Sequence, residues 1–329
     1  MLYIETNSKD AAFYFSAEEY LMRHFEPDVP IMMIWQTEKC VMLGNYQVAD
    51  AEVNISYARK EEMQLVRRPS GGGTIFTDSG TVLYTLILPS ADRQYATEAA
   101  RKEFADSLTG ALNSMGIPAK FEGRNDIVVD GKKVSGIAQH AKNSRLCTHG
   151  SILYNTDLDM LAQVLNVDAA KIQSKAIRSV RSRVTNIKEY MGQPFSTFLS
   201  LLKRNLLEDR NIQNYSLADN ELRKVEEIYH EKYGNPAWTF EKSPRFSFHN
   251  SIRFTEGKVE VYLDIVEGSV ASCSIRGDFL GTVPIRGLEE QLEKITFQYQ
   301  TMHDALDRIT LAPYLGGITK DQLLSCMFN

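Results

Sequence analysis

The order of hydrophobic and polar residues predicts buried strands interleaved with helices over the first half of the chain. Residues 10–25 and 97–115 carry apolar side chains at the spacing of amphipathic helices. Between these two segments, the runs 31–35, 40–44 and 81–88 are nearly all apolar, which is typical of strands buried on both faces. We therefore expect buried strands in the protein interior with helices packed against them.

A different pattern begins near the middle of the chain. Residues 157–234 have mostly helical spacing, and two X-Pro pairs then interrupt the pattern. Beyond them, apolar and polar residues alternate over 259–265, as in a half-buried strand, and helical spacing returns over 286–309. A chain of 329 residues is long for one hydrophobic core. The sequence therefore predicts two domains, residues 1–240 and 246–329.

Three consecutive glycines beside two arginines form the segment with the clearest chemistry. It reads Arg67-Arg68-Pro69-Ser70-Gly71-Gly72-Gly73-Thr74-Ile75-Phe76. Glycine lets a backbone approach a ligand closely, so N–H groups can line an anion site to which arginines add charge. We interpret the segment as a phosphate- or nucleotide-binding turn between two strands; a flexible hairpin tip is the structural alternative. No Lys-Ser or Lys-Thr follows the glycines and their spacing is not G-x-G-x-x-G, which excludes a Walker A loop and a dinucleotide fingerprint.

A second polar cluster begins at Gly123-Arg124-Asn125-Asp126. A short apolar stretch, the pair Asp130-Gly131 and then Lys132-Lys133 follow it. Asp-Gly between two apolar runs predicts a β-hairpin. Because neighbouring residues on a strand face opposite ways, only one of the two lysines can face a site. His149-Gly150 is expected to open a further strand.

Two more segments have both a functional and a structural interpretation. Asn45, Tyr46 and Gln47 follow an expected strand, where side chains often face a ligand, and they equally suit a polar turn. Residues 171–188 contain six basic residues and no acidic one. This segment is either an electropositive strip for an acidic partner or a phosphate, or a solvated face.

Composition narrows the class of protein. The formal net charge of −5 argues against generic nucleic-acid binding. The four cysteines lack Cys-x-x-Cys spacing, which favours reduced thiols over a disulfide framework or a zinc site. We find neither a signal-peptide pattern nor an apolar run of membrane-spanning length. The protein is therefore expected to be cytoplasmic, with no nucleic-acid or membrane partner.

Five motifs, in this order, resemble those of lipoate–protein ligase A. They are Arg67-Arg68-x-Ser70-Gly71-Gly72-Gly73 followed by Asp78, Gly123-Arg124-Asn125-Asp126-Ile127, Lys133-Val134-Ser135-Gly136-x-Ala138, His149-Gly150, and Ser179-Val180-Arg181-Ser182-Arg183-Val184-Thr185-Asn186. Residues 277–281 also resemble part of that family's accessory domain. The resemblance extends over nearly the whole chain. It implies an α+β fold, with a large biotin/lipoate ligase-like catalytic domain of mixed sheet and helices and a small α/β C-terminal accessory domain.

The resemblance also implies an activity. Ligases of this family convert lipoate and ATP into lipoyl-AMP and pyrophosphate with Mg²⁺. They then transfer the lipoyl group to one lysine of a lipoyl carrier domain, in acyltransferase subunits of 2-oxoacid dehydrogenases or in the glycine-cleavage H protein. We expect a monomer. Adenylation gives a carboxylate a better leaving group, so the site needs fixed cations and N–H donors more than a nucleophile of its own.

The resemblance carries residue roles over to this chain. Lys133 matches the catalytic lysine that contacts the α-phosphate and the lipoyl carbonyl, and Arg68 matches an arginine at the nucleotide. The other expected ATP or lipoyl-AMP contacts are Ser70, Gly71, Gly72, Gly73, Thr74, Ile75, Phe76, Asn125, Asp126 and His149. Asp126 is also expected to hold Mg²⁺, although its carboxylate equally suits a turn cap.

Other functions stay open at this point. Octanoyl- and lipoyltransferases share the fold and use a cysteine in place of ATP. Cys147 stands two residues before His149, whereas the transferase pattern has the cysteine three residues before it. That offset turns a strand side chain to the opposite face, so we interpret Cys147 as a small buried filler. A non-catalytic lipoate- or carrier-binding protein would not need Arg68 and Lys133 intact, and the fifth motif disfavours a biotin ligase.

Overall fold

The computed structural model describes residues 1–25, 29–47, 49–89, 96–165, 182–207, 211–240, 248–266 and 268–328. Its largest element is an eight-stranded sheet. The spatial order is β11 (Gln213–Tyr215), β1 (Leu2–Ile4), β2 (Ile31–Trp35), β6 (Thr81–Pro89), β10 (Arg145–Leu153), β9 (Lys132–Lys142), β8 (Asp126–Val129) and β7 (Ala119–Glu122). Strand β1 runs parallel to β11 and β2, and the other neighbours are antiparallel. The sheet is therefore mixed, as expected.

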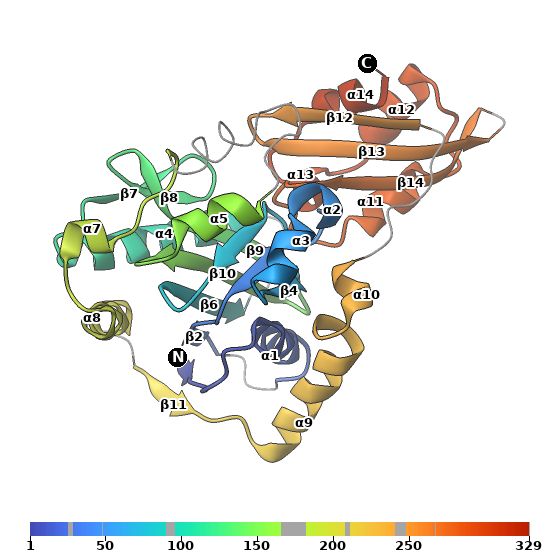
Figure 1. Ribbon diagram of the computed structural model, residues 1–329. Helices are drawn as coiled ribbons and strands as arrows, with labels where there is room; N and C mark the ends of the chain where they lie inside the picture. The colour runs from blue at the N-terminus through green and yellow to red at the C-terminus, as the bar shows by residue number, and fades with distance from the viewer. Residues whose placement is uncertain are drawn as a thin grey trace.

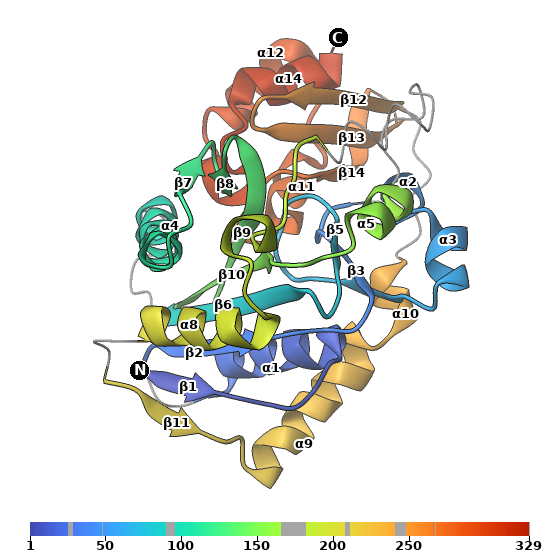
Figure 2. The same cartoon turned by 60° about the vertical axis from the view of Figure 1, so that its left-hand side comes forward.

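Helices cover both faces of this sheet because its central strands carry apolar side chains on both faces. Ile31, Met33 and Trp35 of β2 share a core with α1 (Ala11–Arg23). Met32 and Ile34 point to the opposite core, which α4 (Ala96–Ser114) and α8 (Phe195–Leu207) cover (Figure 2). The predictions of helices at 10–25 and 97–115 are confirmed.

A second, three-stranded sheet holds the glycine run. Its order is β4 (Gln64–Arg67), β3 (Cys40–Leu43) and β5 (Ile75–Thr77), beside the short helices α2 (Ala49–Glu52), α3 (Ile55–Lys60) and α5 (Leu158–Val164). The run joins β4 to β5, so the predicted turn between two strands is confirmed, although β3 separates the two strands. The apolar runs 31–35 and 40–44 belong to different sheets.

A helical segment returns along α1 after β11. It contains α9 (Asp219–Ile228), the π-helix η1 (Tyr229–Tyr233) and α10 (Pro236–Thr239) (Figure 1). Earlier in the chain, the short helix α7 (Lys188–Met191) comes directly before α8. Glu19 of α1 anchors this segment, since its carboxylate lies 2.7 Å from Lys232 Nζ and accepts a hydrogen bond from Tyr233 Oη at 2.6 Å. Lys142 of β9 contacts the same carboxylate at 3.0 Å. Much of the basic segment predicted at 171–188 falls outside the described residues.

The C-terminal residues form a sheet with helices on it. Strands β12 (Phe248–Phe254), β13 (Gly257–Val266) and β14 (Ser269–Gly277) are antiparallel, and α11 (Arg286–Leu292), α12 (Tyr299–Leu306), α13 (Ala312–Leu315) and α14 (Lys320–Phe328) follow. Within the part of the chain that the structure describes, no helix has both the length and the apolar character needed to cross a membrane.

The prediction of one helix over 286–309 is wrong. Helix α11 ends at Leu292 and α12 begins at Tyr299. Lys294 between them has a φ of +68°, and Thr296 forms a bridge with Ser269 at the start of β14. The residues from 295 to 297 are β-branched or aromatic, so they favour an extended backbone at a free sheet edge over continuation of the helix.

Candidate functional site

A pocket lies where the glycine run meets the α1-facing side of the large sheet. Its apolar lining includes Phe15, Trp35, Met42 and Leu83. Of the residues that the sequence predicted for a site, Arg68, Gly72, Gly73, Thr74, Ile75, Asn125, Lys133 and His149 border this pocket. Ser70, Gly71, Phe76 and Asp126 lie outside its lining. The structure therefore brings segments from four of the five motifs to one cavity.

Arg68 holds the glycine run from the protein interior. Its Nη2 donates to the carbonyl oxygens of Gly71 and Gly73, both at 2.8 Å, and its Nε donates to Ser70 Oγ at 3.1 Å. The side chain is buried, and burial together with the charge of Arg67 lowers the pKa of Arg68 to about 10. The guanidinium thus stays charged at neutral pH beneath the loop.

Glycine is required at two places in this loop for different reasons. Gly72 has a φ of +91°, which residues with a Cβ seldom adopt. A Cβ on Gly71 would lie 2.3 Å from the carbonyl oxygen of Phe279, so the C-terminal residues approach the loop too closely for any side chain. A Cβ on Gly73 would meet nothing within 4 Å. The loop is thus clamped on one side and open at Gly73.

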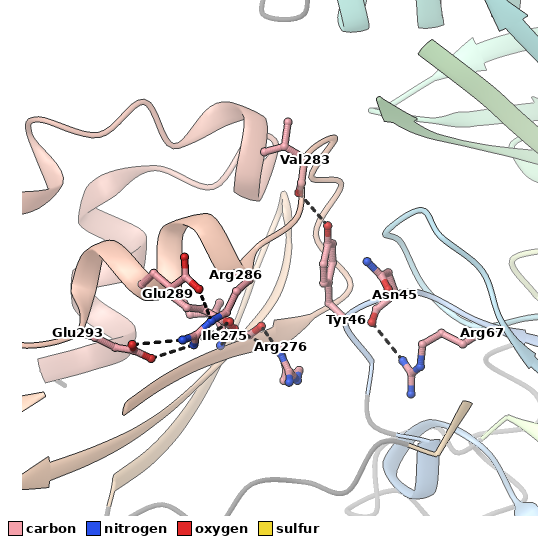
Figure 3. A network of polar contacts seen from close by, with 10 residues as sticks. Asn45, Tyr46, Arg67, Ile275, Arg276, Val283, Arg286, Glu289 and Glu293 are labelled. Atoms are coloured by element: carbon pink, nitrogen blue, oxygen red, sulfur yellow. Dashed lines mark hydrogen bonds and ion pairs between the residues drawn. The ribbon is translucent and has the colours of Figure 1, made fainter. Parts of the chain in front are cut away.

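Arg67 has another role than its neighbour. Its guanidinium donates to carbonyl oxygens in two segments far apart in sequence, those of Gly44, Asn45 and Gln47 and those of Trp238 and Thr239, at 2.6 to 3.3 Å. Figure 3 shows the contact with Asn45. The sequence assigned anion binding to both arginines. For Arg67 this is corrected, because its side chain is 2% exposed, it does not border the pocket as Arg68 does, and its donors serve the backbone.

Tyr46 connects the same segment to the C-terminal residues. Its ring stacks on Phe279 with a centroid distance of 4.7 Å, and its hydroxyl donates to the carbonyl oxygen of Val283 at 3.0 Å (Figure 3). Gln47 accepts hydrogen bonds from Gly44 N and Thr74 Oγ1, both at 2.9 Å. Of the two interpretations of residues 45–47, the structure supports the turn, because Tyr46 and Gln47 brace the loop.

Lys133 stands at the mouth of the hairpin predicted around Asp130-Gly131. Its Nζ lies 2.6 Å from Asp126 Oδ1, while Lys132 is exposed. A bulge at this point pairs Val128 with Lys133 but Ile127 with Ser135, which leaves Val134 as the extra residue. Bulges redirect side chains, so this one places Lys133 at the pocket.

The residues around Lys133 fix its backbone. Its N–H donates to the carbonyl oxygen of Arg183 at 2.8 Å, and its carbonyl accepts from Thr185 N at 3.0 Å. The described part of the fifth motif thus lies against the third. Two hydrogen bonds to Ile137 hold Asn125. Ile137 N donates to the backbone carbonyl oxygen of Asn125 at 2.9 Å, and Asn125 Nδ2 donates to the carbonyl oxygen of Ile137 at 3.0 Å.

The absence of a side chain at Gly136 leaves room for the end of the Lys133 side chain. A Cβ at Gly136 would lie 2.9 Å from both Cε and Nζ of Lys133. Since the end of a lysine is flexible, we expect Gly136→Ala to fold normally but to displace the ammonium group, and to slow any reaction that uses it by about 10- to 100-fold. Steady-state turnover and circular dichroism check this. Gly110→Ala, where a Cβ meets nothing within 4 Å, is the control; equal turnover in the two variants would contradict the assignment.

His149 belongs to a buried chain of polar groups. Its Nε2 lies 2.6 Å from Ser70 Oγ, and its Nδ1 lies 3.0 Å from Glu18 Oε2. Thr85 Oγ1 donates to Glu18 Oε1 at 2.6 Å and accepts from Trp35 Nε1 at 3.1 Å. His149 is in the middle of β10, so the prediction that it opens a strand is wrong. Its strand instead begins at Arg145.

Glu18 was not predicted from the sequence. It is fully buried on the inner face of α1, between Phe15 and Met22 at helical spacing. Burial raises the pKa of Glu18, but the charge of His149 and the hydrogen bonds from His149 and Thr85 outweigh it and hold that pKa below its usual value. A carboxylate therefore persists in the interior. An acidic residue among the apolar residues of the helix was the available signal.

Comparisons with known proteins agree with one another over the whole chain. The family model described as the lipoyl protein ligase A/B catalytic domain matches residues 10–199, and the one described as the bacterial lipoate protein ligase C-terminus matches residues 243–327. A lipoate-protein ligase of Bacillus subtilis is 31% identical, with 100% of both chains covered. A lipoate–protein ligase of Streptococcus pyogenes is 32% identical and covers 97% of this chain and 96% of its own.

Solved structures show the same fold. A P. falciparum protein crystallised in complex with lipoate has a TM-score of 0.77 at 21% identity, with 94% of each chain covered. A bipartite lipoate protein ligase of Thermoplasma acidophilum, described with its E2 lipoyl domain, has a TM-score of 0.68 at 25% identity and covers 75% of this chain and 98% of its own. A lipoate-protein ligase A bound with ATP gives 0.64 at 24% identity, over 73% of this chain and 97% of that one.

Proposed function

This chain belongs to the lipoate–protein ligase family, and we propose that it uses ATP to activate lipoate as lipoyl-AMP and then transfers the lipoyl group to a lysine of a lipoyl carrier domain. One observation carries the proposal: a glycine loop, one lysine and an apolar end share a single cavity. These are the three parts that a phosphate, a reacting carboxylate and a hydrophobic ring system require. The ATP-bound and lipoate-bound relatives support the choice of ligands.

The proposed mechanism follows from the positions of the side chains. Joining a carboxylate to an amine needs a leaving group, and charge develops on the α-phosphate oxygens and on the attacked carbonyl oxygen during adenylation. Lys133 places a compact cation with three donors between these groups. Arg68 holds the loop whose open side at Gly73 faces the nucleotide, and Trp35 and the other apolar lining residues hold the dithiolane ring away from water.

Magnesium forms part of this proposal. Asp126 offers one carboxylate next to Lys133, and Mg²⁺ is commonly held by one or two carboxylates together with substrate phosphates. When bound, the cation would offset the negative charge of the triphosphate. Asp126 would then share its oxygens between the cation and Lys133.

The acceptor is proposed to be a lipoyl carrier domain. The archaeal relative described with its E2 lipoyl domain supports this class. Acyltransferase subunits of 2-oxoacid dehydrogenases and the glycine-cleavage H protein are the carriers to try first. We retain the division into residues 1–240 and 246–329 and the cytoplasmic location as parts of the proposal; four free, buried cysteines agree with a reducing compartment.

The intact mass of an unmodified carrier domain tests the function. The protein is mixed with lipoate and the carrier, with and without ATP and Mg²⁺. A lipoyl mass gain only with ATP supports the ligase. A gain from an acylated donor carrier without ATP would instead establish a transferase, and no gain under either condition, with both carrier classes, would overturn the proposal.

Cys147→Ser separates the ligase from the transferase. Cys147 is fully buried in β10, and burial raises the pKa of its thiol well above the usual value, so a thiolate nucleophile is disfavoured there. We expect Cys147→Ser to retain ATP-dependent ligation within about 3-fold of the unmodified protein, an allowance for small packing changes. Loss of ligation in a variant with unchanged circular dichroism would contradict this expectation and favour a transferase that uses Cys147.

A further inference from the structure

Lys133 stands where strand β9 changes its neighbour. Strand β9 pairs with β10 only as far as Ser135, which lies opposite Ile152. Beyond that point, residues 183–185 lie beside β9, since Val184 forms an isolated parallel bridge with Lys133. The backbone N–H and carbonyl of Lys133 make the two hydrogen bonds of this bridge. On this side, the backbone of Lys133 is therefore held by residues 183–185 and not by β10.

Asn186 fastens these residues to the end of β10. Its Oδ1 accepts a hydrogen bond from Thr156 N at 3.0 Å, and its Nδ2 donates to the carbonyl oxygen of Thr156 at 2.9 Å. Two bonds to one residue give the side-chain amide a defined orientation. The attachment continues at the next residue, because Ile187 N donates to the carbonyl oxygen of Leu153 at 2.8 Å. The Asn186 side chain thus fixes the distance between residues 183–185 and the sheet.

The turn that Asn186 contacts is itself firmly held. Thr156 is buried, and its hydroxyl shares a hydrogen bond of 2.7 Å with Thr81 Oγ1 at the start of β6. Asp78 contacts the same turn, since its Oδ2 accepts from Asp157 N at 2.8 Å. The residues that end the first and the fifth motifs, Asp78 and Asn186, therefore hold one turn, although neither borders the pocket.

A brace of this kind matters because Lys133 lies at a bulge, where the strand ladder is locally disrupted. The Lys133 side chain is 34% exposed, so packing around it does little to fix the ammonium group. We propose that Asn186 is a positioning residue for Lys133. Through Thr156 it fixes residues 183–185, whose bridge sets the Lys133 backbone and thereby directs the ammonium group into the pocket. This inference rests on the proposed ligase function.

The kinetics of Asn186→Ala test the proposal. Misplacing a catalytic group by about 1 Å can cost 10²-fold in rate, so we expect kcat for lipoyl-AMP formation to fall by about 10- to 100-fold. Because Asn186 does not border the pocket, KM for ATP and KM for lipoate should stay within about 3-fold, as expected when only transition-state stabilisation is lost. Pyrophosphate release measures both parameters, and circular dichroism confirms the fold at the assay temperature.

Asn113→Ala is the matched control, because Asn113 forms the same pair of hydrogen bonds elsewhere in the large sheet. Its Oδ1 accepts from Ala119 N at 2.9 Å, and its Nδ2 donates to the carbonyl oxygen of Ala119 at 3.3 Å, at the outer strand β7. We expect a similar decrease of Tm but a kcat within about 2-fold of the unmodified protein, since distant sites act independently. If Asn186→Ala does not fold, Asn186→Asp keeps the acceptor for Thr156 N, with Asn113→Asp as its control.

A double variant shows whether Asn186 acts through Lys133. Gly136→Ala is expected to displace the same ammonium group, so the two losses in kcat should combine to less than their product, whereas independent effects would multiply. Full multiplication, an unchanged kcat in Asn186→Ala, an equal loss in Asn113→Ala, or a rise in KM for ATP alone would each overturn the proposal. If the unmodified protein forms no lipoyl-AMP, the proposed function fails first and this inference fails with it.

Discussion

Lys133→Ala is expected to abolish the formation of lipoyl-AMP while the protein remains folded. The ammonium group is the cation that the structure places at the junction of the glycine loop, Asp126 and the apolar end of the pocket. Removing a preorganised charge that acts on the transition state typically costs 10²- to 10³-fold in rate, so we expect a loss of at least about 10³-fold with two developing charges affected.

The same substitution should change stability very little. The Lys133 side chain is 34% exposed, and its ion pair with Asp126, which is 36% exposed, lies at the surface. Such pairs contribute about 0–1 kcal/mol. The backbone contacts of Lys133 with Arg183 and Thr185 do not involve the side chain and persist in alanine.

Pyrophosphate release and the mass of the bound adenylate measure the effect, and circular dichroism monitors the fold. Lys132→Ala is the matched control, because this neighbouring lysine is exposed and lies on the turn side of the bulge. Near-normal adenylation in Lys133→Ala would refute the site assignment. If the unmodified protein forms no adenylate, the proposed function itself fails, which is a distinguishable result.

The hairpin at Asp130-Gly131 was predictable because its signal is local. Both residues have positive φ, 50° and 73°, as the Asp-Gly pair indicates for a tight turn. The hairpin pattern alone did not predict which lysine faces the pocket, since strict alternation breaks at the bulge; only the family resemblance selected Lys133. A bulge depends on how two strands pair and leaves no mark in the residue pattern of one strand.

The contacts of His149 illustrate a second limit of prediction from the sequence. Glu18 is 131 positions away in the chain, and the residues between them contain no signal that pairs the two.

The two arginines were the hardest residues to distinguish. They are adjacent, both buried and chemically identical. The glycine-loop pattern gives both the same role, and the resemblance alone assigns the nucleotide to Arg68. Their side chains contact different segments. Arg68, which follows β4, lies under the glycine loop, while Arg67 at the end of β4 joins the Gly44–Gln47 turn to α10. These partners are distant in sequence, so the residue pattern could not separate the two roles.

Arg67→Met is therefore expected to cause the largest loss of stability among single substitutions in this region. Methionine fills a similar volume but leaves the carbonyl oxygens of Gly44, Gln47 and Thr239 without their donors at 2.9, 2.6 and 2.7 Å. Each unpaired buried acceptor costs about 1–3 kcal/mol, part of which relaxation and entering water recover. We expect a total of about 4 kcal/mol.

Urea-induced unfolding measures this change, with fluorescence as a local readout because Trp238 Nε1 donates to the carbonyl oxygen of Arg67 itself. Arg59→Met, at an exposed position of α3, should shift the unfolding free energy by less than about 0.5 kcal/mol. Arg67→Lys then separates the two roles. If Arg67 served only as a positive charge for phosphate, lysine would restore stability and activity; because its planar fork bridges two segments, lysine should restore neither. Full rescue by lysine would show that Arg67 acts as a positive charge at the anion site.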